Sequence, residues 1–283
     1  MIPTIPQNPL IRLVYGAYVA LFFVYLALPL TVVAVFAFND SQFPSLPWAG
    51  FTLGWFFGSE RPMIGVFHED PILRAIGTSV IIGLAVSALS VAVGTTNAFL
   101  FNRYQFRGRG FLYVLMLLPL VIPGIVLGIS ILVFSSSLAN AAWDAAEIDI
   151  QALRPGLLLV ILGQFSFVTT IATLVIAARL QKFDRTLEEA ALNLGASHLT
   201  AVRTITLPYL APAMIGAFVV SFLMSFENFN TTLMLVGSDS PLTIAMFDRL
   251  KLGSTPLLNA VSLLLMLGSS LLALVMIAFQ RKS

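Results

Sequence analysis

Polar side chains of three kinds gather in one short segment of an otherwise apolar stretch. The segment SFENFNTT, residues 225–232, places the carboxylate of Glu227 among phenylalanines, asparagines and threonines. A carboxylate offers charge pairing to an organic cation, and an aromatic face adds a cation–π contact. A charge at membrane depth costs about 2.5–3.5 kcal/mol on insertion scales, so we expect Glu227 to face protein or water rather than lipid. The segment is therefore a candidate binding site for a cationic solute.

Helical geometry selects the residues of this candidate path. If the segment is helical, Asn230 and Thr231 lie on the face of Glu227, at i+3 and i+4. The residues predicted to line the path are Glu227, Asn228, Asn230, Thr231, Phe226 and Gln164. The alternative, of equal weight, is an interhelical hydrogen-bond cluster that holds the helices together. Further polar residues of the apolar stretches are expected to be packing contacts more than path: Thr95, Thr96, Asn97, Ser166, Thr169 and Thr170.

The second candidate site is the one long amphiphilic segment between apolar stretches. Thr186, followed three residues later by Glu189, has the pattern of a capping box, which satisfies backbone N–H groups at a helix start. An apolar stripe follows at i, i+3, i+4 and i+7, formed by Leu187, Ala190, Ala191 and Leu194. Such a stripe is typical of an amphipathic helix, and Glu188 and Asn193 lie off it.

A bend should follow this short helix. Gly195 supplies the left-handed residue that ends a helix without a Cβ penalty. Ser197 suits the N-cap of a second helix, and Pro208 suits a first helical turn, where its missing N–H is not needed. The product is a helix-turn-helix elbow with small residues at its tip, which lets another backbone come close.

The spacing within this elbow resembles the EAA signature of the permease subunits of bacterial ABC importers. The matching positions are Glu189, Ala190, Ala191, Gly195, Ile205, Leu207 and Pro208. In that family the loop forms coupling helices that dock on a separate ATPase subunit. The resemblance implies this role for Thr186, Leu187, Glu188, Glu189, Ala190, Ala191, Leu194, Gly195, Ala196 and Ser197. The alternative is a surface helical hairpin between two membrane spans.

The composition indicates an integral membrane protein. Of 283 residues, 58% are hydrophobic and 10% charged, whereas soluble domains carry about a quarter charged residues. The net charge of +2 is too small to suggest a nucleic-acid partner. There is no cysteine, and His68 and His198 lack ligand spacing, so thiolate and metal chemistry are not expected. No Gly-x-x-x-x-Gly-Lys-Ser/Thr segment is present, so ATP would bind to another subunit.

Six apolar stretches are long enough to cross a bilayer, which takes about 20 residues. They are residues 13–38, 75–101, 111–134, 157–180, 211–237 and 260–280. The first is longer than the apolar core of a cleavable signal peptide, about 7–15 residues. Pro119 and Pro123 predict a broken or bent third span. We expect an all-α membrane protein, one domain over residues 1–283, with the elbow at residues 182–208.

Basic residues predict the orientation. With the amino terminus inside, ten Lys and Arg lie inside: Arg12, Arg103, Arg107, Arg109, Arg179, Lys182, Arg185, Arg203, Arg281 and Lys282. Five lie outside: Arg61, Arg74, Arg154, Arg249 and Lys251. The positive-inside rule therefore predicts that both termini and the elbow are cytoplasmic. The outside segments are then residues 39–74, 135–156 and 238–259, and the first carries aromatics suited to the membrane interface: Trp48, Phe51, Trp55, Phe56 and Phe57.

Most of the chain resembles the polyamine-type members of this permease family. The segments that resemble them are FNDSQF at 38–43, GFTLGWF at 50–56, MLLPLVIPGIVLGISIL at 116–132 and ARLQKFDRTLEEAALNLGAS at 178–197. Opine, phosphonate and iron permeases look similar. Where polyamine permeases usually carry paired aspartates in span five, this chain has Glu227 and Asn228. A monocationic or zwitterionic substrate therefore fits as well as a polyamine.

The resemblance implies a six-span, type I importer permease with the MetI-like fold, in the bacterial inner membrane. Its implied partners are a pair of ATPase subunits that hold ATP and Mg, a second permease chain, a periplasmic binding protein and the lipid bilayer. No cofactor, metal or nucleic acid is expected on this chain, and it is not expected to be an enzyme. The alternative class is an ion-coupled secondary transporter, but such carriers tend to show inverted repeats. No such repeat is visible.

Overall fold

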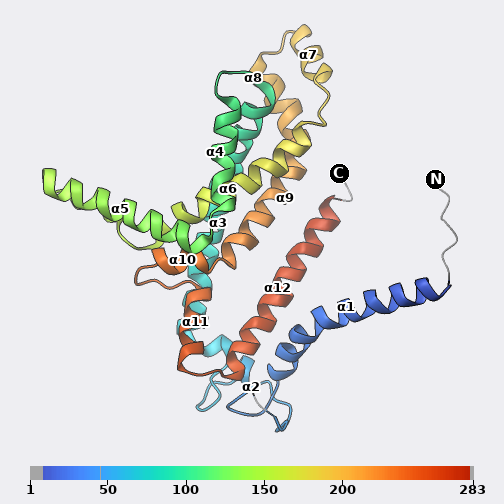
Figure 1. Ribbon diagram of the computed structural model, residues 1–283, viewed down its shortest axis with the longest axis vertical. Coiled ribbons are helices and arrows are strands. Elements are labelled where there is room, and N and C mark those ends of the chain that lie inside the picture. Colours follow the sequence, from blue (N-terminus) through green and yellow to red (C-terminus); the bar gives the residue numbers. More distant parts are fainter. Residues whose placement is uncertain (1–8, 45, 281–283) are drawn as a thin grey trace. The chain divides into compact units, whose positions relative to one another are not determined.

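The computed structural model of the protein describes residues 9–44 and 46–280 (Figure 1). Within these ranges the regular elements are helices, with one isolated bridge between Asn39 and Phe51. The chain forms two compact units, Met1–Asp70 with Arg249–Leu267, and Pro71–Asp248 with Gly268–Ser283. Six of the described helices are long and apolar enough to cross a membrane. The expected all-helical membrane architecture is therefore confirmed.

The first unit contains α1 (Pro9–Phe36), the short helix α2 (Gly54–Phe57) and the 3-10 turn η1 (Val66–His68). Its loop is organised around Asn39, which is fully buried and accepts a hydrogen bond from the indole Nε1 of Trp55 through its backbone carbonyl, at 2.9 Å. The prediction of an aromatic interfacial belt is wrong for Trp55 and Phe56, which are buried. They serve as the core of the loop, because a long loop needs apolar side chains to pack against its backbone.

The second unit holds the two candidate sites. Its elements, with those shared between the units, are α3 (Asp70–Arg103), α4 (Arg109–Val121), α5 (Gly124–Ala146), η2 (Gln151–Leu153), α6 (Leu157–Leu180), α7 (Thr186–Asn193), α8 (His198–Ala201), the π-helical turn η3 (Val202–Thr206), α9 (Leu207–Phe226), α10 (Asn230–Leu235), α11 (Leu242–Leu252) and α12 (Pro256–Gln280). α6 matches the predicted fourth span residue for residue.

Small residues bring α3, α6 and α9 close together. A Cβ on Gly94 of α3 would lie 2.9 Å from the backbone nitrogen of Thr173 in α6, and one on Gly83 would lie 2.9 Å from the Phe222 ring of α9. Around this contact a core of buried apolar residues forms: Ala98, Ala172, Ile176, Leu180, Phe183, Leu210 and Ala217. The two contacts hold the three helices together at two levels, with Phe222 near the end of α9 that is away from the elbow, and the elbow emerges from the other end (Figure 1).

Several predicted boundaries are wrong, among them that of the fifth span, expected at residues 211–237, which the structure has at His198–Phe226. The third span is indeed broken at Pro123, as the prolines predicted, but the membrane-length helix is α5 and not residues 111–134. α5 continues to Ala146, so residues 135–146, expected in a loop, are helical. Alanines supply helix propensity there despite the polar neighbours. Residues 238–259, also expected as loop, contain α11.

Candidate functional site

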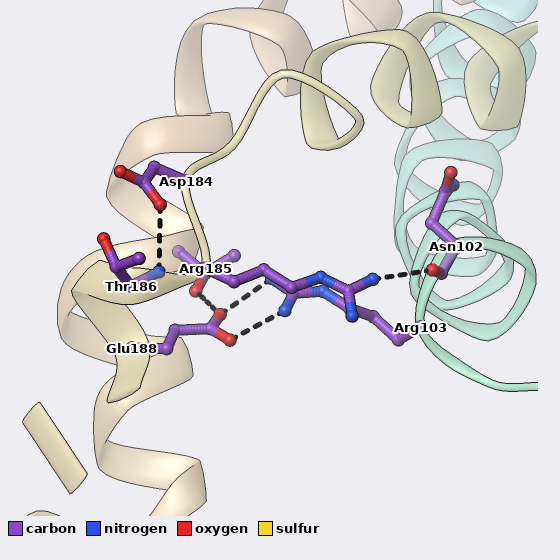
Figure 2. A network of polar contacts seen from close by, with 7 residues as sticks. Asn102, Arg103, Asp184, Arg185, Thr186 and Glu188 are labelled. Atoms are coloured by element: carbon purple, nitrogen blue, oxygen red, sulfur yellow. Dashed lines mark hydrogen bonds and ion pairs between the residues drawn. The ribbon is translucent and has the colours of Figure 1, made fainter. Parts of the chain in front are cut away.

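The first helix of the elbow is capped by a residue two positions before the predicted cap, Thr186. Asp184 accepts a hydrogen bond from the backbone nitrogen of Thr186 at 3.0 Å, and Thr186 is the first residue of α7 (Figure 2). The predicted capping box of Thr186 and Glu189 is therefore wrong, because the aspartate two residues upstream already satisfies the first helical N–H. Hydrogen bonds from the backbone and hydroxyl of Thr186 hold the pKa of Asp184 below its usual range.

The bend has the predicted geometry. Gly195 takes a φ of +90°, its N–H donates to the carbonyl of Leu192 at 2.9 Å, and that of Ala196 donates to Ala191 at 3.0 Å. These two bonds define a Schellman motif, which satisfies the last carbonyls of α7. Ser197 then caps α8, accepting from the N–H of Thr200 at 3.2 Å.

α8 runs on into the fifth membrane helix. The π-helical turn η3 joins α8 to α9, and Pro208 lies in the first turn of α9, as predicted. Because proline has no N–H and its ring crowds the carbonyl of Thr204 four residues earlier, the regular ladder is disturbed at this point. α8, η3 and α9 nevertheless form one continuous helical segment, His198–Phe226.

An ion pair that the sequence did not reveal ties the elbow to α3. Both guanidinium nitrogens of Arg103 contact the carboxylate of Glu188, at 2.8 and 2.9 Å (Figure 2). The hydroxyl of Thr206 donates to the same carboxylate, and Arg185 donates to the carbonyl of Asn102 at 3.0 Å. The side chains of Arg103 and Glu188 are 15% and 16% exposed. This bidentate geometry is the strong form of an ion pair.

The apolar stripe of the elbow is left uncovered. Leu187, Leu194 and Leu199 are exposed, Leu194 to 90%. Glu189, Ala190 and Ser197 are exposed as well, while Ala191 and Ala196 are half-buried. Glu188, off the stripe, anchors the elbow, whereas Leu187 and Leu194 of the stripe, and Leu199 of α8, stay exposed. Exposed apolar surface of this kind is typical of sites that contact another protein or a membrane.

In the polar segment, the structure separates residues that the sequence grouped together. α9 ends at Phe226, Glu227 is its C-terminal flanking residue, and α10 begins only at Asn230. The prediction that Glu227 shares a continuous helical face with Asn230 and Thr231 is therefore wrong. Glu227 and Asn230 are exposed, Phe226 is half-buried and Thr231 is buried.

Buried amides and hydroxyls hold this helix break in place. Gln164 of α6, 1% exposed, donates to the hydroxyl of Thr232 at 2.8 Å and accepts from the hydroxyl of Ser225. The side-chain oxygen of Asn228 accepts from the backbone nitrogen and hydroxyl of Thr232, at 3.2 and 3.0 Å. For Gln164 and Asn228 these bonds favour the interhelical cluster over a solute path.

Other polar side chains also form hydrogen bonds within the chain. Thr231 donates to the carbonyl of Gly124 at 3.2 Å and Thr170 to that of Met116 at 2.7 Å. Thr95 and Thr96 bond to carbonyls of their own helix. In the described part of the chain, Glu227 has no hydrogen bond or ion pair through its side chain. Glu227 and Asn230 are therefore the polar groups of the segment that remain available to a solute.

Comparisons with known proteins agree over most of the chain. The family model described as "binding-protein-dependent transport system inner membrane component" matches residues 90–282. The putrescine transport system permease protein PotI of Escherichia coli (strain K12) is 29% identical over 247 residues, 86% of this chain and 82% of the relative. The spermidine/putrescine transport system permease protein PotC of Haemophilus influenzae is 28% identical, over 93% of this chain and 94% of the relative.

A solved structure shares the fold. It is the crystal structure of a bacterial ABC transporter involved in the import of the acidic polysaccharide alginate, and it superposes with a TM-score of 0.73 at 16% identity. The superposition covers 96% of this chain and 95% of that one. At this low identity the likeness shows the fold alone.

Proposed function

This chain belongs to the family of binding-protein-dependent transport system inner membrane components, and from that membership we propose that it carries a polyamine or related organic cation into the cytoplasm. It is an ABC importer permease related to PotI and PotC. In our proposal a binding protein outside the membrane delivers the solute, and a second permease chain completes the pathway.

The exposed leucines of the elbow, Leu187, Leu194 and Leu199, carry this proposal. Burying a fully exposed leucine is favourable by about 1.5–3 kcal/mol; Leu194, 90% exposed, would gain most of this on docking, and the other two, 51% and 61% exposed, would gain part of it. A pair of ATPase subunits is the partner that covers these leucines in our proposal. ATP and Mg bind there, because this chain contains no P-loop. The chain itself then has no enzymatic activity.

Charge asymmetry supports the orientation that docking requires. The protein is a multi-pass inner-membrane protein, and we propose that both of its termini and the elbow are cytoplasmic. The elbow holds Lys182, Arg185 and Arg203, and residues 102–110, where α3 ends and α4 begins, hold Arg103, Arg107 and Arg109; these are six of the ten basic residues assigned to the inside. Basic residues within about 15–20 residues of a span are the ones that set orientation.

The substrate class rests on Glu227. Its carboxylate is exposed, the residue before it, Phe226, is half-buried, and Asn230, three residues further on at the start of α10, is exposed. A carboxylate, a ring and an amide together provide a counter-charge, a cation–π surface and a hydrogen-bonding group for an ammonium ion. The names of the relatives favour putrescine or spermidine, and one carboxylate also suits a solute with a single charge.

Reconstituted transport tests this function. The permease, copurified with its ATPase and second permease chain, is placed in proteoliposomes with the binding protein outside and ATP inside. We expect labelled putrescine or spermidine to accumulate only with ATP, with an ATP-free vesicle as the control. Accumulation driven by an ion gradient without ATP would instead establish a secondary transporter.

A further inference from the structure

A groove in the second unit is lined by three membrane helices and has a single charged group at one end. Its volume is about 440 Å³, and it is lined by Val175, Arg179, Pro212, Ala213, Gly216, Val220 and Met276. These residues come from α6, α9 and α12. Apart from Arg179 the lining is apolar, so the groove cannot satisfy a charged group from its own walls.

The guanidinium of Arg179 has unused hydrogen-bonding capacity. Its Nε is buried without a hydrogen-bond partner, and its Cζ lies 4.4 Å from the centre of the Tyr209 ring. Among the described residues no carboxylate pairs with Arg179. Burying a donor without an acceptor is unfavourable, and the deficit is larger for a charged group. The Nε itself is too buried to meet an incoming group, but the guanidinium as a whole lacks a counter-charge among the described residues, and an anion from outside the chain would supply it.

Helix geometry gives the depth of each part of the groove. Arg179 lies in the last turn of α6, a membrane helix of 24 residues, which at 1.5 Å per residue is about 36 Å long against a hydrocarbon core of about 30 Å. Its guanidinium is thus at headgroup level. From Pro212 the lining continues along α9 to Val220, two helical turns or about 12 Å toward the hydrocarbon.

We propose that this groove binds an anionic phospholipid, with the lipid phosphate on Arg179 and one acyl chain lying along Ala213, Gly216 and Val220. A guanidinium matches phosphate through paired N–H donors, and an apolar trough of this depth matches an acyl chain. Buried Gly216 contributes no side chain, so the trough stays open beside it. A free phosphate would leave the apolar wall empty, and therefore the lipid is the better occupant.

Native mass spectrometry of the full chain in detergent tests the site. We expect one phosphatidylglycerol to be retained per chain and phosphatidylcholine to be retained roughly tenfold less, the ratio that about 1.4 kcal/mol produces. Arg179→Gln should lower phosphatidylglycerol retention by roughly tenfold, since it removes the charge and the charge-assisted hydrogen bonds to the phosphate, while Arg179→Lys should keep most of it. Lys182→Gln is the matched control, because Lys182 is exposed and outside the lining.

A second variant separates the trough from the charge. Ala213→Leu leaves Arg179 in place and fills the acyl path, so it should also release the lipid, whereas glycerol 3-phosphate should not compete. Equal retention of the two lipids, or unchanged retention in Arg179→Gln, overturns the proposal. Efficient cross-linking of Ala213→Cys to a second permease chain in native membranes also overturns it, because a protein chain would then cover the groove. None of these readouts depends on polyamine transport.

Discussion

In the elbow, residues 182–208, leucine side chains are exposed and the charged side chain of Glu188 is held in an ion pair. In the polar segment, residues 225–232, uncharged side chains are held in hydrogen bonds and the charged one is exposed. Leu194 is 90% exposed while Glu188 is paired with Arg103. In the polar segment Ser225 and Thr232 are buried and hydrogen-bonded to Gln164, and Glu227 stays exposed. The elbow therefore exposes leucines, which are unfavourable in water, and the polar segment exposes a carboxylate, which is unfavourable at membrane depth.

The contrast separates partner surfaces from scaffold. In water an exposed leucine is unfavourable, so the leucines of the elbow indicate a protein partner. At membrane depth an exposed carboxylate is unfavourable, so Glu227 indicates a partner chain, water or a cationic solute. The residues tied down in each region, Glu188 and Gln164, keep those surfaces in place.

The largest effect is expected from breaking the bend of the elbow. Gly195→Val forces a β-branched residue into φ +90°, which costs about 1–2 kcal/mol from backbone strain alone. A Cβ added at this position would meet no atom within 4 Å, so the variant tests strain and not a clash. We expect loss of ATPase copurification and of uptake, measured on the same preparations.

Gly195→Asn is the matched control for that variant, because asparagine tolerates the left-handed region. It should retain most of the ATPase. Normal uptake by Gly195→Val would show that the elbow does not dock the ATPase and would favour the alternative, a surface helical hairpin between two membrane spans.

Glu227→Gln tests the other region. The amide keeps size and hydrogen bonding but removes the charge, so cation uptake per assembled complex should fall by roughly tenfold if about 1.4 kcal/mol of pairing is lost. The helix break should persist, since Glu227 takes no part in the Gln164 network. Wild-type uptake at equal complex yield would return Glu227 to a structural role, because interhelical hydrogen bonds in membranes average only about 0.6 kcal/mol.

A smaller effect is expected from the ion pair that anchors the elbow. Glu188→Gln and Arg103→Gln each remove one partner of a mostly buried pair, which should cost about 1–3 kcal/mol of local stability. The double variant should lose little more than either single one, since the two residues act as one unit. The readout is uptake per ATP hydrolysed, with exposed Arg107→Gln as the control. Additive losses would show that the pair does not act as a unit.

The smallest effect concerns the start of α7. Because the pKa of Asp184 is depressed in the folded state, its contribution is present above the unfolded pKa of about 3.9 and is lost as pH falls through the folded value. Amide exchange at Thr186 should therefore be steady from pH 8 to about pH 5 once corrected for intrinsic rates. Asp184→Ala should exchange faster across that whole range, and unchanged exchange would contradict the cap.

Local chemistry explains what could be predicted. The left-handed turn at Gly195, the cap at Ser197 and the bounds of α6 depend on neighbouring residues, and all three are confirmed. The six-span importer permease fold is confirmed as well. These features follow from glycine conformation, capping chemistry and the length of apolar stretches.

Long-range contacts explain what was missed. Arg103 and Glu188 are 85 residues apart in sequence, and Gln164 and Thr232 are 68 apart. The break after Phe226 contains neither glycine nor proline, so the local sequence predicts a continuous helix. The hydrogen bonds from Gln164 of α6 stabilise the break instead. The Asp184 cap was within reach of sequence reasoning, because aspartate commonly bonds to the backbone two residues on.

Cross-linking from Leu194 tests the docking of the elbow most directly. The chain has no cysteine of its own, so Leu194→Cys supplies one thiol at the most exposed leucine of the elbow, and Glu227→Cys supplies one in the other region. With a short bifunctional reagent in native membranes, we predict that Leu194→Cys forms an adduct with the ATPase subunit and that Glu227→Cys does not. An adduct of Leu194→Cys with the external binding protein, or equal ATPase labelling from both positions, would contradict the account.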